Sequence, residues 1–298
     1  MMTRSSALKI TLPLCVGMGF FVALSAIAYI PPSEFVVKNM TAKRAGPKML
    51  KVRSSVRDLE SKKNLLTLSY FSLETGRVVT HFFSPAGGVT PSIAANLSAK
   101  DAIYTYTSSI QKSEDSAPGI IPIALYSQDF QRVSENLIAA GVPIRSTEYL
   151  LTLQDEQARL ASEVTSLKRW LGRPHWIYGG ATHPAMGGGK PQSELWIEKD
   201  RFIMTRLMNP ETRPGFEFRF ESYQYSKDFP YPRKLSVVDQ SRDAEVMTEE
   251  VLEFISLAAI EPSVLQARGK STYSEDDLAG VQDSDLKRLI QTYCSFMR

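Results

Sequence analysis

The sequence predicts an α+β fold that is mainly antiparallel β. Most of its regular segments place apolar residues at every second position, the period of a strand with one buried face. Short turns separate many of these segments, and strands joined by short turns pair in antiparallel fashion. Helical spacing is confined to a few segments, the clearest of them near the two ends of the chain.

The composition is that of a globular protein and excludes several classes of function. Of 298 residues, 43% are hydrophobic and 22% are charged, which excludes collagen-like and wholly disordered chains. The 35 Lys and Arg against 32 Asp and Glu give a net charge of +3, too small for a dedicated nucleic-acid-binding protein. Two cysteines cannot form a cysteine-rich zinc site, and the histidines are too scattered for metal ligation, at positions His81, His175 and His183. We therefore expect neither a metal nor a cofactor.

The first 28 residues have the three parts of a secretory signal peptide. Arg4 and Lys9 precede an uncharged apolar stretch that starts at Ile10. The stretch ends in Ala26-Ile27-Ala28, which offers the small residues that a signal peptidase requires. We predict export and cleavage after Ala28. Because about 20 apolar residues can also cross a bilayer, an uncleaved inner-membrane anchor is the alternative.

The amino-terminal part of the mature chain indicates a helix, three strands and a loop. Val36 and Met40 lie four residues apart, with Gly46 beyond the basic residues that follow them. This spacing is typical of a short amphipathic helix that begins near Ser33. The period then changes to two, which predicts three consecutive strands at residues 49–57, 64–72 and 77–83. A loop rich in Gly, Pro and Ser follows.

The middle of the sequence is open to two interpretations. Apolar residues at 120–126 predict a strand, and Ser127 is placed to cap a following helix. Between 146 and 171, the content of Glu, Gln, Ala and Leu favours a helix. The residues on either side of Gly172-Arg173-Pro174 would also form a hairpin over 164–178.

Strands dominate again in the carboxyl half. Short turns separate five apolar segments, at residues 195–198, 201–208, 215–225, 233–239 and 244–254. In the third segment, Phe216, Phe218 and Phe220 share one face, which predicts that this face is buried. Tyr223 and Tyr225 continue the pattern one position out of step, as a β-bulge would require.

A final helix is expected at residues 274–296. Ser274 begins a capping-box pattern, and apolar residues follow at helical spacing. The residues expected to pack against the strands are Leu278, Val281, Leu289 and Tyr293.

Two motifs that would suggest an enzyme are incomplete. The segment GGATHPAMGGGK (179–190) has Pro184 where a phosphate-binding loop needs glycine, and Pro191 follows its lysine. Ser109 and Lys112 have the S-x-x-K spacing of penicillin-interacting enzymes, but the companion motifs do not match and the segment reads as a polar loop. We therefore expect no enzyme, and an exported hydrolase is a third interpretation.

Four segments of the sequence resemble those of a known family. Three are similar to the family's strand hairpins: LWIEKDRFIMTRL (195–207), FRFESYQ (218–224) and FPYPRKLSVVD (229–239). The segment from Val36 to Arg44 is similar to the family's amino-terminal helix. Through these segments the chain resembles the LolA/LolB-like outer-membrane lipoprotein-sorting proteins. The likeness covers about residues 33–85 and 164–256, and it favours the hairpin interpretation of 164–178.

This resemblance implies an incomplete, half β-barrel whose concave face is closed by helices. Its apolar cavity would hold a lipid-like ligand or the acyl chains of a lipoprotein, in a periplasmic, membrane-proximal transport protein of a Gram-negative envelope. The side chains expected to contact this ligand are Phe216, Phe218, Phe220, Phe202 and Met204. The alternative is an interaction module, in which a packed barrel contacts an envelope protein or senses the state of the envelope.

The expected domain organisation follows from these interpretations. A signal peptide covers 1–28, and a half-barrel domain covers 29–262 with an insert around 84–163. A helical extension covers 263–298. The insert and the extension are not part of the family's usual pattern, so they distinguish this chain from the lipoprotein carriers that it resembles.

Overall fold

The computed structural model describes most of the chain from residue 31 onward. The described residues are 31–84, 97–109, 124–144, 165–179, 193–209, 215–258 and 278–296. The predicted signal peptide over 1–28 lies outside them. Within these ranges, no helix is long and apolar enough to cross a membrane.

Most of the described strands belong to one sheet. Its members are β1 (Met49–Asp58), β2 (Asn64–Ser72), β3 (Arg77–Phe83), β4 (Tyr104–Ser109), β5 (Thr165–Trp170), β6 (Arg173–Gly179), β7 (Glu194–Glu198), β8 (Ile203–Asn209), β9 (Phe216–Glu221), β12 (Lys234–Asp239) and β13 (Ala244–Leu257). These 11 strands follow the order β4-β3-β2-β1-β13-β12-β9-β8-β7-β6-β5, and neighbours pair antiparallel throughout.

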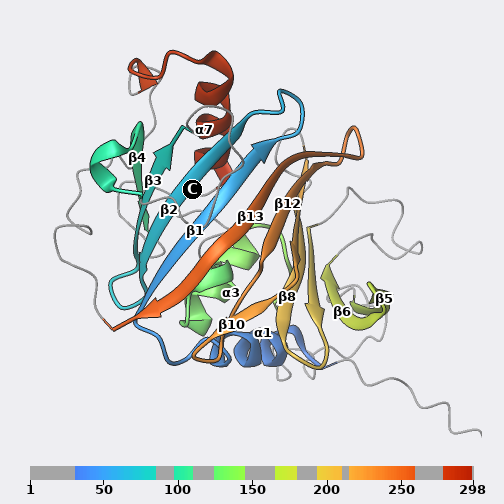
Figure 1. The fold of residues 1–298 in the computed structure, drawn as a ribbon. Coiled ribbons are helices and arrows are strands. Elements are labelled where there is room, and N and C mark those ends of the chain that lie inside the picture. The colour runs from blue at the N-terminus through green and yellow to red at the C-terminus, as the bar shows by residue number, and fades with distance from the viewer. Residues whose placement is uncertain are drawn as a thin grey trace, which may run out of the picture.

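The sheet curves without closing into a barrel. Its edge strands β4 and β5 do not pair with each other, and the long strand β13 joins the two halves by pairing with β1 and β12 (Figure 1). A small separate hairpin is formed by β10 (Gln224–Ser226) and β11 (Phe229–Tyr231). The open antiparallel sheet and its few helices confirm the predicted α+β class.

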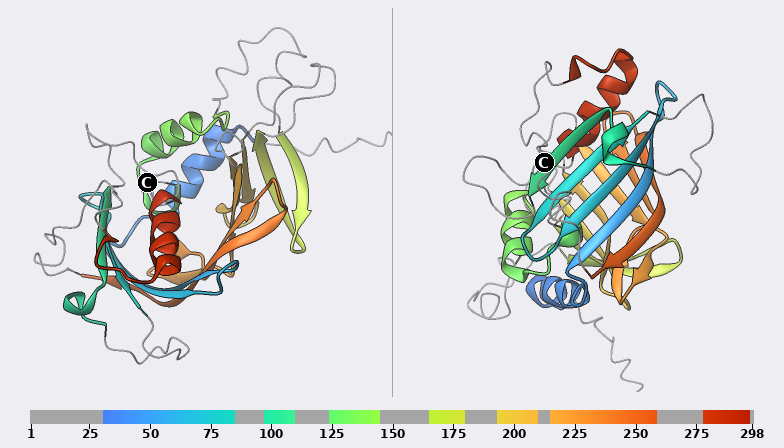
Figure 2. Two further views of the ribbon diagram at one scale, coloured as in Figure 1. Left: turned by 90° about the horizontal axis from the view of Figure 1, so that it is seen from above. Right: turned by 60° about the vertical axis from the view of Figure 1, so that its left-hand side comes forward.

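Three α-helices of the described residues lie on the concave side of this sheet. They are α1 (Ser33–Ala42), α3 (Phe130–Ala139) and α7 (Ser284–Phe296), and a 3-10 turn, η2 (Ala99–Asp101), precedes β4. Figure 2 shows α7 against the inner surface of the sheet and α1 and α3 across its open side. Buried side chains from all three helices and from both halves of the sheet form one continuous apolar core.

The aromatic strand expected at 215–225 is interrupted. Strand β9 ends at Glu221, because Ser222 adopts a left-handed backbone with φ of +54° that a strand cannot accommodate. Tyr225 belongs instead to β10, in the separate hairpin. The prediction of one bulged strand is therefore wrong, and the chain turns at this point.

The middle of the chain differs from the prediction in two places. Ala124–Tyr126 are helical, where a strand over 120–126 was expected. Ser109, expected in a polar loop, ends strand β4, which pairs with β3, and the rest of that expected loop, including Lys112, lies outside the described residues. The hairpin interpretation of residues 164–178 is confirmed by β5 and β6.

Two helices begin differently from the expected positions. The side chain of Asp129, not that of Ser127, caps α3 by accepting hydrogen bonds from the amides of Gln131 and Arg132. Helix α7 begins at Ser284, where Oδ1 of Asp283 accepts hydrogen bonds from backbone amides. The Ser274 pattern lies outside the described residues. The stripe predicted to pack against the strands is confirmed as buried, in residues Leu278, Val281, Leu289 and Tyr293.

Candidate ligand-binding site

The five residues expected to contact a ligand all lie against the apolar core. Phe216, Phe218 and Phe220 point inward from β9, and Phe218 and Phe220 are only 4% and 1% exposed. Met204 points inward from the neighbouring strand β8, and Phe202 lies in the turn before it. Strand alternation thus places the three phenylalanines of β9 as the sequence predicts. Phe202 lies outside the strand expected over 201–208, because its left-handed backbone, with φ of +54°, belongs to the turn before β8.

The structure separates these residues into two groups. The ring of Phe296 in α7 lies edge-on to Phe216 and Phe218, with centroids 4.8 and 5.5 Å apart. Phe202 lies instead between Phe35 of α1 and Trp176 of β6, at 6.3 and 5.3 Å. The predicted ligand face is therefore covered by α7 at one end and by α1 at the other.

Two small cavities lie between the sheet and its helical cover. Each has a volume of about 10 Å³ measured to the centre of a water-sized sphere, room for roughly one water molecule. Leu125 borders both of them. The first is lined by Leu125, Tyr126, Tyr231, Pro232, Leu235, Glu249 and Val251. The second is lined by Met40, Arg44, Leu125, Phe202, Ile203, Met204, Tyr223 and Pro230.

A polar cluster lies inside the apolar core beside the first cavity. Glu249 points inward from β13 and is 6% exposed, and Oε1 accepts a hydrogen bond from the Tyr293 hydroxyl at 3.4 Å. The hydroxyls of Tyr126 and Tyr231 form a hydrogen bond of 2.5 Å. Burial raises the pKa of Glu249 above its usual value, and the hydrogen bond from Tyr293 offsets this only in part.

Strand alternation in β13 is a sequence signal for this cluster. Met247, Glu249 and Val251 occupy alternate positions of β13 and therefore share its inward face. A carboxylate among inward apolar positions indicates a buried polar group. The hydrogen-bond partner of Glu249, Tyr293, and the neighbouring pair of Tyr126 and Tyr231 come from distant segments, and nothing local in the sequence predicts that they meet.

Arg44 connects the end of α1 to Ser127 and Gln128, which precede α3. Its guanidinium is buried and donates to the carbonyl oxygen of Ser127 at 3.0 Å, while Gln128 Nε2 donates to the Arg44 carbonyl at 2.8 Å. Burial lowers the pKa of Arg44 to about 10, so it keeps its charge at neutral pH. These bonds hold the end of α1 against the segment that precedes α3.

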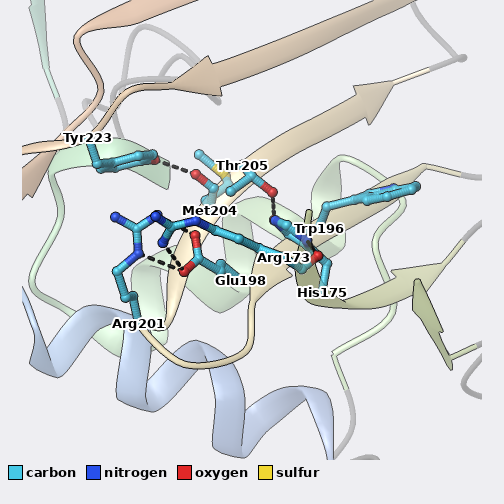
Figure 3. Close-up of polar contacts among 8 residues, drawn as sticks. All are labelled: Arg173, His175, Trp196, Glu198, Arg201, Met204, Thr205 and Tyr223. Atoms are coloured by element: carbon cyan, nitrogen blue, oxygen red, sulfur yellow. Dashed lines mark hydrogen bonds and ion pairs between the residues drawn. The ribbon is translucent and has the colours of Figure 1, made fainter. Parts of the chain in front are cut away.

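The turn that carries Phe202 is held by a buried carboxylate. Glu198 accepts hydrogen bonds from Nη1 of Arg173 at 2.9 Å and from Nε of Arg201 at 2.6 Å (Figure 3). Burial alone would raise the pKa of Glu198, but the hydrogen bonds from Arg201 and Arg173 hold it below its usual value. Tyr223 donates to the Met204 carbonyl on the other side of the same turn.

Two of the three histidines weighed as possible metal ligands lie in the described part of the chain. His81 and His175 are buried, and their Nδ1 atoms lie 2.8 and 2.9 Å from Thr105 Oγ1 and the Arg173 carbonyl. His183, Lys112 and the glycine-rich loop after Gly179 lie outside the described residues. In the described part of the chain, no group of His, Cys, Asp and Glu could hold a metal ion.

Comparison with known proteins finds similarity in fold. No family model and no curated protein match the chain. A domain provisionally assigned to outer membrane lipoprotein sorting, from Vibrio parahaemolyticus, is 7% identical with a TM-score of 0.47, over 78% of this chain and 95% of that one. A DUF1329 family protein from Desulfovibrio piger is 10% identical with a TM-score of 0.43, over 80% and 98%. A LolA superfamily protein from Nitrosomonas europaea is 9% identical with a TM-score of 0.40, over 79% and 98%.

At such identities and TM-scores these similarities identify neither a family, a ligand nor a binding residue for this chain.

Proposed function

We propose that this protein is an exported envelope protein that holds a lipid-like ligand, or the acyl chains of a lipoprotein, on the concave face of its half-barrel. One observation carries the proposal. In the described part of the chain, an aromatic and aliphatic concave face is covered mainly by helices, and the only further sheet is the two-stranded β10–β11 hairpin, which adds Phe229 and Tyr231 to the core. Short helices can separate from such a face without breaking the strand pairing.

The chemistry of the face suits an apolar chain. Each methylene group transferred from water to an apolar surface gains about 0.8 kcal/mol, and this gain requires no charged partner. Phe216, Phe218, Phe220, Phe202 and Met204 would supply the contacts. The proposed activity is therefore binding and transport, without a catalytic step.

Binding requires the helical cover to move. The two described cavities hold about 10 Å³ each, and an acyl chain needs far more. Because α7 covers the aromatic strand and α1 covers Phe202, at least one of these helices must leave the sheet to admit a ligand.

The same cavities favour a second candidate function. If the helices never separate from the sheet, the interior is a packed core, and the outer surface would contact an envelope protein. The small volume of the described cavities is the observation that supports this interaction module.

Titration with a fluorescent polyene fatty acid distinguishes the two functions. A lipid-binding protein saturates with the probe, and an added long-chain fatty acid displaces it. A protein with a permanently packed interior gives no saturable fluorescence change. The titration should use the mature full-length chain after delipidation, so that a retained ligand does not block the site.

A further inference from the structure

Helix α7 occupies the place where the proposed ligand would lie. The Phe296 ring contacts Phe216 and Phe218 on β9, and the Tyr293 ring lies edge-on to Phe82 on β3 at 5.6 Å. Strands β3 and β9 belong to different halves of the curved sheet. Helix α7 therefore contacts both halves of the concave surface, and Figure 2 shows the helix on the inner side of the curved sheet.

The Tyr293 side chain combines an apolar body with a polar tip. Its ring packs against apolar neighbours, while its hydroxyl donates to Oε1 of Glu249 at 3.4 Å. Glu249 also lines the first cavity, which has no α7 residue among its lining, so this residue borders space that α7 does not fill. A chain with a hydroxyl or amide donor could replace both the ring and the hydroxyl of Tyr293.

If α7 only completed the apolar core, it would not need the hydrogen-bonded pair of Glu249 and Tyr293. Burying a carboxyl group in apolar surroundings costs free energy unless its hydrogen bonds are fully satisfied. A leucine at position 249 and a phenylalanine at position 293 would suit the surrounding apolar side chains. The carboxyl group is thus better explained by recognition than by packing.

We propose that α7 is an intramolecular occupant of an acyl-chain site, and that Glu249 is the polar anchor of that site for chains that carry a hydrogen-bond donor. This inference rests on the proposed function. Ligand and α7 compete for Phe216, Phe218 and Glu249. The apparent affinity for ligand is therefore reduced by the fraction of molecules in which α7 is docked.

Weakening the α7 contacts in the full-length chain tests the competition. Phe296→Ala removes two ring contacts on α7 without changing the sheet. Stearic acid should displace the fluorescent fatty acid from this variant at roughly two- to tenfold lower concentration than from the wild type, because an aromatic pair contributes about that factor. Ser295→Ala, an exposed neighbour on the same helix, should leave the affinity unchanged. Tyr293→Phe provides a second, milder way to weaken docking.

Comparing two chains tests the anchor. Hydroxystearic acid, with its hydroxyl in mid-chain, should bind the wild type about three- to tenfold more tightly than stearic acid, the usual effect of one net hydrogen bond. Glu249→Leu should abolish the preference, and Glu249→Gln, which keeps a donor and an acceptor, should preserve part of it.

The outcomes separate this inference from the proposed function. If both chains bind the wild type equally and Phe296→Ala has no effect, the inference is wrong and the lipid-binding function stands. If neither chain binds the wild type or any folded variant, the proposed function itself is wrong.

Discussion

The ring of Phe296 lies edge-on to the ring of Phe218, with 5.5 Å between their centroids. Phe296 ends the described part of the C-terminal helix, and Phe218 lies in the middle of β9. The contact brings the C-terminal helix onto the face that the sequence assigns to a ligand. It makes Phe218 a core residue whenever α7 is docked.

Phe218→Ala should therefore lower the free energy of unfolding of the ligand-free protein by about 3–5 kcal/mol, the usual cost of removing a buried aromatic ring. Urea denaturation measures this change. Phe35→Ala provides the control, because Phe35 is 51% exposed and its truncation should cost much less. Equal effects of the two substitutions would show that α7 is not packed on Phe218 in solution.

Glu198→Gln should lower the free energy of unfolding by about 1–3 kcal/mol, because it weakens charge-assisted hydrogen bonds from Arg173 and Arg201. The Glu198 side chain is 3% exposed, whereas that of Glu74, which pairs with Lys48, is 63% exposed. Glu74→Gln should change stability by less than about 0.5 kcal/mol. Thermal melts of both variants measure the difference, and equal shifts would contradict the assigned role of Glu198.

The two buried carboxyl groups should respond oppositely to pH. The lowered pKa of Glu198 means that its stabilisation is present above the usual value of 4.5 and is lost as the pH falls. The pKa of Glu249 is raised in the folded protein. Its contribution to the free energy of unfolding is therefore fully present below pH 4.5 and is lost as the pH rises through the raised pKa. The titratable groups that interact electrostatically with Glu249 are the hydroxyls of Tyr126, Tyr231 and Tyr293.

Glu249→Gln should remove that decline. The free energy of unfolding should be measured from pH 4 upward. Over the pH range in which a buried carboxyl group ionises, it should fall with rising pH in the wild type and change less in the variant. Parallel curves for the two proteins would show that Glu249 ionises normally.

Two glycines with similar backbones should differ in their tolerance of alanine. Gly172 and Gly179 have φ of +78° and +85°, a conformation that costs other residues about 1–2 kcal/mol. An added Cβ meets nothing within 4 Å at Gly172, but would lie 2.0 Å from the Ser193 carbonyl oxygen at Gly179. Gly172→Ala should therefore give a folded protein with a modest loss of stability, and Gly179→Ala a much larger loss. Equal melting temperatures would contradict the close approach.

Local patterns predicted most of the sheet. Strands β2 and β3 begin and end where the sequence places them, because alternating apolar residues flank the turn at Leu73–Gly76. Strand β4 was missed because its residues between Tyr104 and Ser109 are mostly polar, and pairing with β3 stabilises it instead. Whether such a segment forms a strand depends on pairing with a neighbouring strand, and the sequence of the segment alone does not specify that pairing.

The candidate site was predicted only in part. Phe216, Phe218 and Phe220 follow from alternation within one strand. The helix that covers them follows from its own apolar spacing, but its position on that strand depends on long-range packing. The Glu249 cluster combines four segments of the chain, so no local pattern predicts it.

Native mass spectrometry of the full-length protein, purified gently from the envelope of its own host, tests the lipid-binding function most directly. The proposed function predicts an additional species whose excess mass corresponds to a bound lipid or acyl chain, and which disappears after delipidation. A single species at the mass of the mature chain, together with no binding of added fatty acid, would contradict it.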